Sequence, residues 1–215
     1  MIISPGRSYI FVHAPKTGGT SLALALEARA MKDDIMLGDT PKALKRRRRL
    51  KGVQAAGRLW KHATLADIEG VVSRDEIAGM FTFTLVRNPW DRVVSYYHWL
   101  RAQGFDHPAT RLAKSASFDV FLQDRSTQAS LRDWPARRYM TDGAGGERAN
   151  AYIRLEHFEE DAAPLFRHLG FTLELPYENT SRRDRDHRPY YTDVLREIVS
   201  DCCAEDIARF GYRFG

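Results

Sequence analysis

Cysteine is scarce in this chain: its 215 residues include only Cys202 and Cys203, which are neighbours in the sequence. Adjacent cysteines rarely bridge each other, and no Cys/His spacing typical of a metal site accompanies them. The sequence therefore argues against a disulfide-stapled secreted domain and against a zinc module. We expect a reducing, cytoplasmic environment and no metal ligands.

Long apolar runs are missing as well. No stretch reaches membrane-spanning length, and the apolar start Met1-Ile2-Ile3 is interrupted at once by Ser4-Pro5-Gly6, so we expect no membrane span and no signal peptide. The composition, 43% hydrophobic and 28% charged, is an ordinary globular balance. A chain of this length predicts a single domain over residues 1–215.

Signatures of nucleic-acid binding are also absent, although the chain is basic, with a net charge of +5 and a pI near 9.3. The run Lys45 to Arg49 is either a polyanion-binding patch or a solvated helix face or loop. The second interpretation is favoured, because no zinc finger, helix-turn-helix or RNA-recognition signature accompanies the run. We expect no nucleic-acid partner, and the charge is consistent with an anionic ligand.

The most informative stretch is Ser8 to Leu22, which combines three local signals. Tyr9 to Val12 predicts a short buried strand, and Pro15 ends it because proline has no amide hydrogen for a sheet ladder. Gly18-Gly19 allows the backbone to approach a ligand closely. Good helix formers follow, which predicts a helix over residues 20–31.

A strand, a glycine turn and a helix start in this order predict an anion-binding site. Backbone amides and the positive end of the helix dipole point at the same spot. Lys16 adds a full charge, while Thr17, Thr20 and Ser21 add hydroxyls, and either Thr20 or Ser21 can cap the helix.

The usual nucleoside-triphosphate loop is not present, because its lysine follows the glycines, whereas Lys16 precedes them. A second strand over residues 80–86 ends in Arg87, where a P-loop hydrolase needs an acid to hold magnesium. An arginine there recognises an anion through its planar fork. A small-molecule or nucleotide kinase is therefore the weaker alternative, and a non-catalytic polyanion-binding protein is another.

Arg87 opens a second motif. Asn88 caps a helix that is predicted to reach about Gln103, and Pro89 suits its first position. Arg87 and Ser95 are separated by a strand end and two helical turns, so both can reach one phosphate. The structural alternative for Arg87 is an ion pair with an acid such as Asp91.

These two motifs resemble those of the sulfotransferases that use 3′-phosphoadenosine 5′-phosphosulfate (PAPS), in particular the bacterial and carbohydrate-type enzymes. Pro15 to Ser21 is similar to their phosphosulfate loop, Pro-Lys-x-Gly-x-Thr-Ser/Thr, and Arg87 with Ser95 is similar to their site for the 3′-phosphate. Looser likenesses are Arg154-Leu155-Glu156 and the Asn-x-Ser loop at Asn179. The resemblance runs from about residue 8 to the C-terminus, with gaps at 32–59 and 105–150.

The resemblance implies transfer of a sulfuryl group from PAPS to a hydroxyl or amine, leaving adenosine 3′,5′-bisphosphate (PAP), with no metal. It implies that the acceptor is a carbohydrate or small metabolite. Lys16 would neutralise the breaking bridge oxygen, and the loop amides would hold the 5′-phosphate. His62 would accept the acceptor's proton, because family members carry a His-Ala-Thr-like element in this region. The implied PAPS-binding residues are Lys16, Thr17, Gly18, Gly19, Thr20, Ser21, Arg87, Ser95, Arg182 and Arg188, with Arg183 as an alternative among the last arginines.

The remaining patterns predict an α/β fold with a mostly parallel central sheet and helices on both faces, and the resemblance implies a P-loop-like three-layer arrangement. Residues 1–7 read as a loose lead, and Ser73 begins a short helix. A third strand is expected over 151–155. Thr64 to Asp67 reads as the start of a helix with Thr64 as its cap. Further helices are expected at 118–122, 134–140, 156–169 and 191–209, the last with Val194 facing inward. Residues 105–150 read as an insertion that shapes an acceptor pocket.

Overall fold

The computed structural model describes residues 1–176 and 186–215. The chain divides into two compact units: unit 1 is Met1–Val86 with Ala136–Asn179, and unit 2 is Arg87–Pro135 with Thr180–Gly215. The single domain over residues 1–215 therefore stays a prediction.

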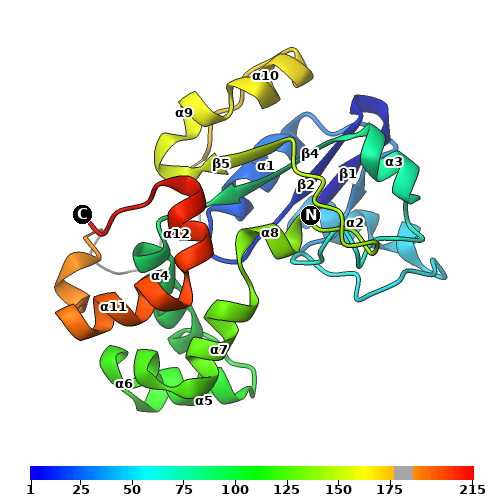
Figure 1. Ribbon diagram of the computed structural model, residues 1–215. Helices are drawn as coiled ribbons and strands as arrows, with labels where there is room; N and C mark the ends of the chain where they lie inside the picture. The colour runs from blue at the N-terminus through cyan, green and yellow to red at the C-terminus, as the bar shows by residue number, and fades with distance from the viewer. Residues whose placement is uncertain (177–185) are drawn as a thin grey trace. The chain divides into compact units, whose positions relative to one another are not determined.

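Unit 1 is built on a five-stranded sheet with the order β3-β1-β2-β4-β5 (Figure 1). β2 pairs with β4, and β4 with β5, in parallel, while β1 is antiparallel to both β2 and β3. Since only β1 runs against the others, the prediction of a mostly parallel sheet is confirmed. The strands are β1 (Ile2–Ser4), β2 (Tyr9–Val12), β3 (Ile35–Met36), β4 (Phe81–Val86) and β5 (Ala151–Arg154).

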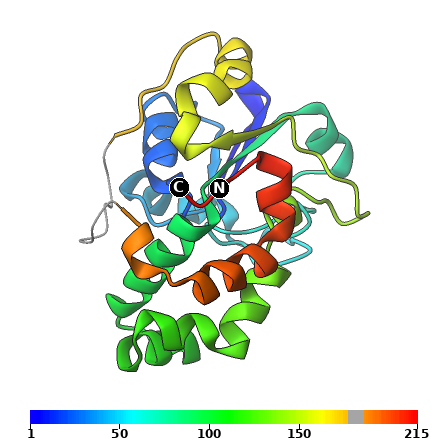
Figure 2. The ribbon, with the colours of Figure 1, turned by 60° about the vertical axis from the view of Figure 1, so that its left-hand side comes forward.

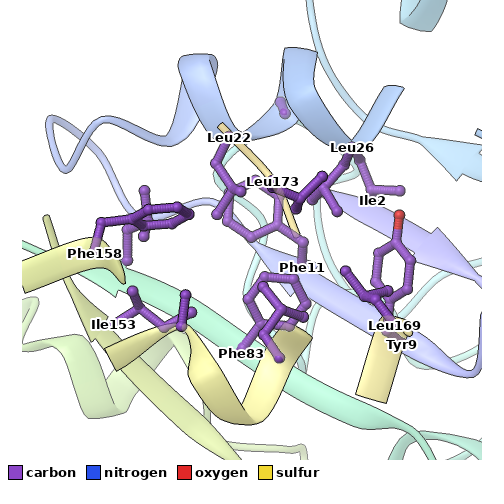
Figure 3. Packing of buried hydrophobic residues seen from close by; sticks show 14 of the residues in the cluster. Ile2, Tyr9, Phe11, Leu22, Leu26, Phe83, Ile153, Phe158, Leu169 and Leu173 are labelled. Atoms are coloured by element: carbon purple, nitrogen blue, oxygen red, sulfur yellow. The ribbon is translucent and has the colours of Figure 1, made fainter. Parts of the chain in front are cut away.

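Helices cover both faces of this sheet, because alternate side chains of each strand point to opposite faces. On one face Phe11 stacks on Phe83, with ring centroids 5.4 Å apart. The same cluster takes in Leu22 of α1 (Gly19–Ala28), Phe158 of α9 (Phe158–Asp161) and Leu169 of α10 (Ala163–Leu169) (Figure 3).

A second cluster forms on the opposite face. Ile10 and Val12 of β2 pack there with Ile77 of α3 (Arg74–Gly79) and Tyr139 of α8 (Ala136–Tyr139). The segment between α2 (Pro41–Arg46) and α3 adds Leu65 and other apolar residues to the same cluster. The predicted three-layer arrangement of sheet and helices is therefore present in unit 1.

The expectation of a loose lead at residues 1–7 is wrong. Ile2 and Ile3 are almost fully buried, and β1 pairs with β2 in the register Ile3↔Ile10. A 3-10 turn, η1 (Pro5–Arg7), and a left-handed Ser8 (φ 52°) reverse the chain between the two strands. A short hairpin with two apolar residues gives too little periodicity to be recognised from sequence.

The helix expected at Thr64 is also wrong, although its capping bonds are present. The Asp67 carboxylate accepts hydrogen bonds from the Thr64 amide (2.7 Å) and hydroxyl (2.9 Å), and the Asp67 amide donates to that hydroxyl. These bonds close a turn, and no helix forms over residues 64–67. The expected helix over 156–169 is likewise divided into η3 (Leu155–His157), α9 and α10.

Two other helix starts are confirmed. Ser73 and Glu76 form a reciprocal capping box on α3. The Asn88 side chain accepts hydrogen bonds from the Trp90 and Asp91 amides at the start of α4 (Pro89–Arg101). Both sites satisfy backbone donors that a helix leaves without internal partners.

Unit 2 consists of helices, with no strand among its described residues (Figure 2). Val94 and Tyr97 of α4 share an apolar cluster with Phe121 and Val199. The expected helix over 191–209 is divided at Cys203, and Val194 is 61% exposed, so its expected inward position is wrong. The remaining elements are α5 (Pro108–Ser115), α6 (Phe118–Gln123), α7 (Arg125–Asp133), η4 (Arg188–Tyr190), α11 (Asp193–Cys202) and α12 (Ala204–Phe210).

The basic run forms the end of α2 (Pro41–Arg46) and the following η2 (Arg47–Leu50). Arg46 donates a hydrogen bond to the Met31 carbonyl (2.7 Å), and Arg49 donates to the Lys32 carbonyl. Two arginines of the basic run therefore hold the loop after α1 by hydrogen bonds, which is consistent with the interpretation of the run as a helix face. Across the described part of the chain, no helix combines the length and apolarity needed to cross a bilayer.

Candidate functional site

The connection between β2 and α1 has an unusual backbone. Gly18 (φ 85°) and Lys16 (φ 64°) both adopt left-handed conformations. A lysine there is strained, and such strain of about 1–3 kcal/mol is found at sites where the surrounding structure holds the chain for a function. Gly18 is the N-cap of α1, which begins at Gly19, so the expected cap at Thr20 or Ser21 is wrong.

The two glycines are required by their neighbours. A Cβ on Gly18 would lie 2.8 Å from a methyl carbon of Leu155, and one on Gly19 would lie 2.1 Å from a ring carbon of His13. Any larger residue would displace the loop from these supports. The glycines thus allow the loop to lie close to His13, which follows β2, and to Leu155, which follows β5. The predicted close approach to a ligand stays a prediction.

Other groups of the loop are used to hold its shape. Thr17 is buried, and its hydroxyl donates a 2.9 Å hydrogen bond to the Ala14 carbonyl. The Ser21 amide donates to the Gly18 carbonyl at 3.1 Å, so it serves the first turn of α1. The Ser21 amide is thus used inside the helix, whereas the amides of Gly18, Gly19 and Thr20 lie at the positive end of α1. Anion binding by these amides stays a prediction.

His62 belongs to the same unit as this loop and contacts the residue that precedes it. Its Nδ1 atom lies 2.7 Å from the His13 carbonyl oxygen, and the two rings meet edge to face at 4.7 Å. A carbonyl only accepts hydrogen bonds, so Nδ1 carries the proton and Nε2 carries the lone pair. Trp60 packs on the imidazole from another side, with ring centroids 5.0 Å apart.

This environment keeps His62 neutral. Burial lowers its pKa to about 4; the hydrogen bond to His13 opposes that shift, and the charge of Lys61 adds to it. At neutral pH the ring is therefore in its proton-accepting form. The sequence placed His62 on a loop, but its contact with His13, 49 residues away, has no sequence signal.

Arg87 and Ser95 lie in unit 2. The Arg87 guanidinium donates to the Asp91 carboxylate at 2.8 Å, and both side chains are 18% exposed. The ion pair weighed as the structural alternative is thus present. An acid that orients a guanidinium does not prevent the guanidinium from binding an anion, so the phosphate-binding role stays a prediction. Ser95, on α4, is buried.

The C-terminal arginines are only partly described. Arg188 is exposed and makes a two-pronged ion pair with Asp186, with nitrogen–oxygen distances of 2.9 Å. Arg182 and Arg183 lie outside the described residues. Among the residues that are described, no group of three or more His, Cys, Asp or Glu side chains is arranged to hold a metal ion.

A comparison with known protein families identifies the family of the chain. The model of the sulfotransferase family matches residues 1–213. The chain belongs to the sulfotransferase family. One similar solved structure is that of mouse sulfotransferase SULT7A1 complexed with PAP, with a TM-score of 0.50 and 16% identity over 95% of this chain and 86% of that one. At 16% identity, this likeness shows only that the two proteins share a fold. No curated protein matches the chain.

Proposed function

We propose that this sulfotransferase transfers the sulfuryl group of PAPS to a hydroxyl or amine of a carbohydrate or small metabolite. The observation that carries the proposal is the β2–α1 loop, with its left-handed Lys16 and Gly18, in a chain that belongs to the family. Mouse sulfotransferase SULT7A1, one of the solved structures with this fold, was complexed with PAP, the product that PAPS leaves after transfer.

The donor half of the reaction depends on the loop. In this proposal the amides at the start of α1 hold the 5′-phosphate, and the Lys16 ammonium neutralises the negative charge that grows on the bridging oxygen. Because PAP, which leaves through its 5′-phosphate oxygen, is a good leaving group, the protein contributes chiefly positioning and charge stabilisation. Arg87 and Ser95 bind the 3′-phosphate, which distinguishes this donor from other adenine nucleotides.

The acceptor half depends on His62. The acceptor oxygen or nitrogen attacks sulfur, the bond from sulfur to the bridging oxygen breaks, and PAP leaves. The acceptor's proton passes to Nε2 of His62, the nitrogen that the hydrogen bond at Nδ1 leaves unprotonated.

The proposal is tested with PAPS carrying a radioactive sulfur. The enzyme is incubated with saccharides, phenols and amines, and transfer of label to each acceptor is measured beside PAP release. We expect PAP release and labelling of at least one acceptor, and loss of both in Lys16→Ala. Phosphate transfer from ATP with magnesium, without any use of PAPS, would instead support a kinase.

A further inference from the structure

His13 lies between the loop and His62. It follows β2 directly, is 6% exposed, and its ring stacks on Phe11 with centroids 5.8 Å apart. On one side the ring fills the space that a Gly19 side chain would need, since a Cβ there would lie 2.1 Å from its Cδ2 atom. The first residue of α1 therefore rests on this imidazole.

On the other side His13 holds the candidate base. Its carbonyl oxygen is 2.7 Å from Nδ1 of His62, and the two rings meet edge to face at an interplanar angle of 76°. The His13 carbonyl determines which nitrogen of His62 carries the proton, while the His13 ring packs against the His62 imidazole and holds its orientation. One residue thus touches both the donor loop and the base.

We infer that His13 is a positioning residue that holds His62 in the Nδ1–H tautomer and in a fixed relation to the phosphosulfate loop. The inference rests on the proposed function, and it assigns His13 no contact with the reacting atoms. A base must meet its proton within hydrogen-bond reach, and displacement by about 1 Å can cost two orders of magnitude in rate. A rigid link between the loop and the base supplies that precision.

His13 itself is suited to a fixed role because it stays neutral. Burial holds its pKa well below the usual value, and the Met1 amine, His62, Lys61 and Lys16 shift it in the same direction. Asp39 and Lys61 also act on His62, with opposite signs. Because His13 stays neutral, a change in the titration of His62 that follows substitution of His13 reflects the altered surroundings of His62.

The test compares His13→Ala, which removes the ring, with His13→Phe, which keeps its bulk. Nitrogen-15 NMR reads the tautomer and the titration of His62, whose signals are assigned by their loss in His62→Asn. We expect one Nδ1–H tautomer in the unmodified protein and in His13→Phe. His13→Ala keeps the backbone carbonyl at this position but removes the ring that packs against the His62 imidazole and holds it in reach of the carbonyl. In that variant we therefore expect a weakened hydrogen bond, a mixture of tautomers and a His62 pKa that moves from about 4 toward 6.5.

Kinetics provide the second readout, with the acceptor found by labelled transfer. His13→Ala should lower kcat roughly 10- to 100-fold, and His13→Phe should recover most of that loss. In a His62→Asn background, His13→Ala should lower kcat no further, because its effect acts through His62. Thermal unfolding of each variant, run in parallel, separates these effects from loss of folded protein.

An Nε2–H tautomer of His62 in the unmodified protein would overturn the inference, as would a tautomer that His13→Ala leaves unchanged. Equal kinetic losses in His13→Phe and His13→Ala would also overturn it, since ring chemistry would then matter and not positioning. The NMR result does not depend on PAPS. An enzyme that shows the expected tautomers but neither binds PAP nor uses PAPS would contradict the proposed function alone.

Discussion

Acid should destabilise this protein through His62. The unfolded ring titrates near 6.5, while burial lowers the folded pKa to about 4, so between these values the unfolded state binds more protons. The free energy of unfolding is then fully retained above pH 6.5 and falls as the pH drops toward 4. A difference of 6.5 − 4 = 2.5 pKa units corresponds to about 3 kcal/mol.

Urea denaturation at a series of pH values from 7.5 to 4.5 measures this dependence. His62→Asn removes the titration but keeps an amide donor near the position of Nδ1, so its unfolding free energy should depend less steeply on pH. His13 has a lowered pKa as well, so part of the slope will remain in that variant. His157→Asn is the matched control, because the His157 side chain is 52% exposed. Parallel curves for the unmodified protein and His62→Asn would refute the reasoning.

Three further predictions concern the site. His62→Ala should lose turnover by roughly 10²–10⁴-fold with nearly unchanged PAP affinity, whereas Lys16→Ala should impair both; a folded His62→Ala enzyme with normal turnover would end the assignment of the base. Arg87→Ala should weaken the binding of PAP, measured by calorimetry, by about 1.5–3 kcal/mol and the binding of adenosine 5′-monophosphate much less. Ser95→Ala should show the same selectivity to a smaller degree. Equal losses of binding for both ligands would contradict the 3′-phosphate role. Gly19→Ala should destabilise the protein by about 1–3 kcal/mol and weaken PAP binding, because the added Cβ would lie 2.1 Å from the His13 ring. Gly79→Ala is the control and should change neither stability nor PAP binding, because no atom lies within 4 Å of its added Cβ.

The parts of the fold that were predictable carry local signals. Pro15 and Gly18-Gly19 mark the end of β2 and the turn into α1, while Asn88 and Pro89 mark the start of α4. Each signal depends on neighbours in the chain, so periodicity and capping rules detect it. The family motifs coincide with these same two junctions.

The parts that were missed depend on distant residues. β1 is stable because β2 and β3 pair with it on both sides, and nothing within Ile2–Ser4 announces those partners. At Thr64 the capping bonds formed around a turn, which shows that a capping pattern alone does not specify a helix. The His13–His62 contact joins two loops that the sequence treats separately.

Calorimetry with PAP tests the central claim most directly, because it needs no acceptor. PAP, adenosine 5′-monophosphate and ATP are titrated into the protein with and without magnesium, and Lys16→Ala is titrated with PAP as the control. The account predicts that PAP binds more tightly than either of the other nucleotides, that magnesium does not change its affinity, and that Lys16→Ala weakens it. Failure to bind PAP, or tighter binding of ATP that requires magnesium, would contradict the account.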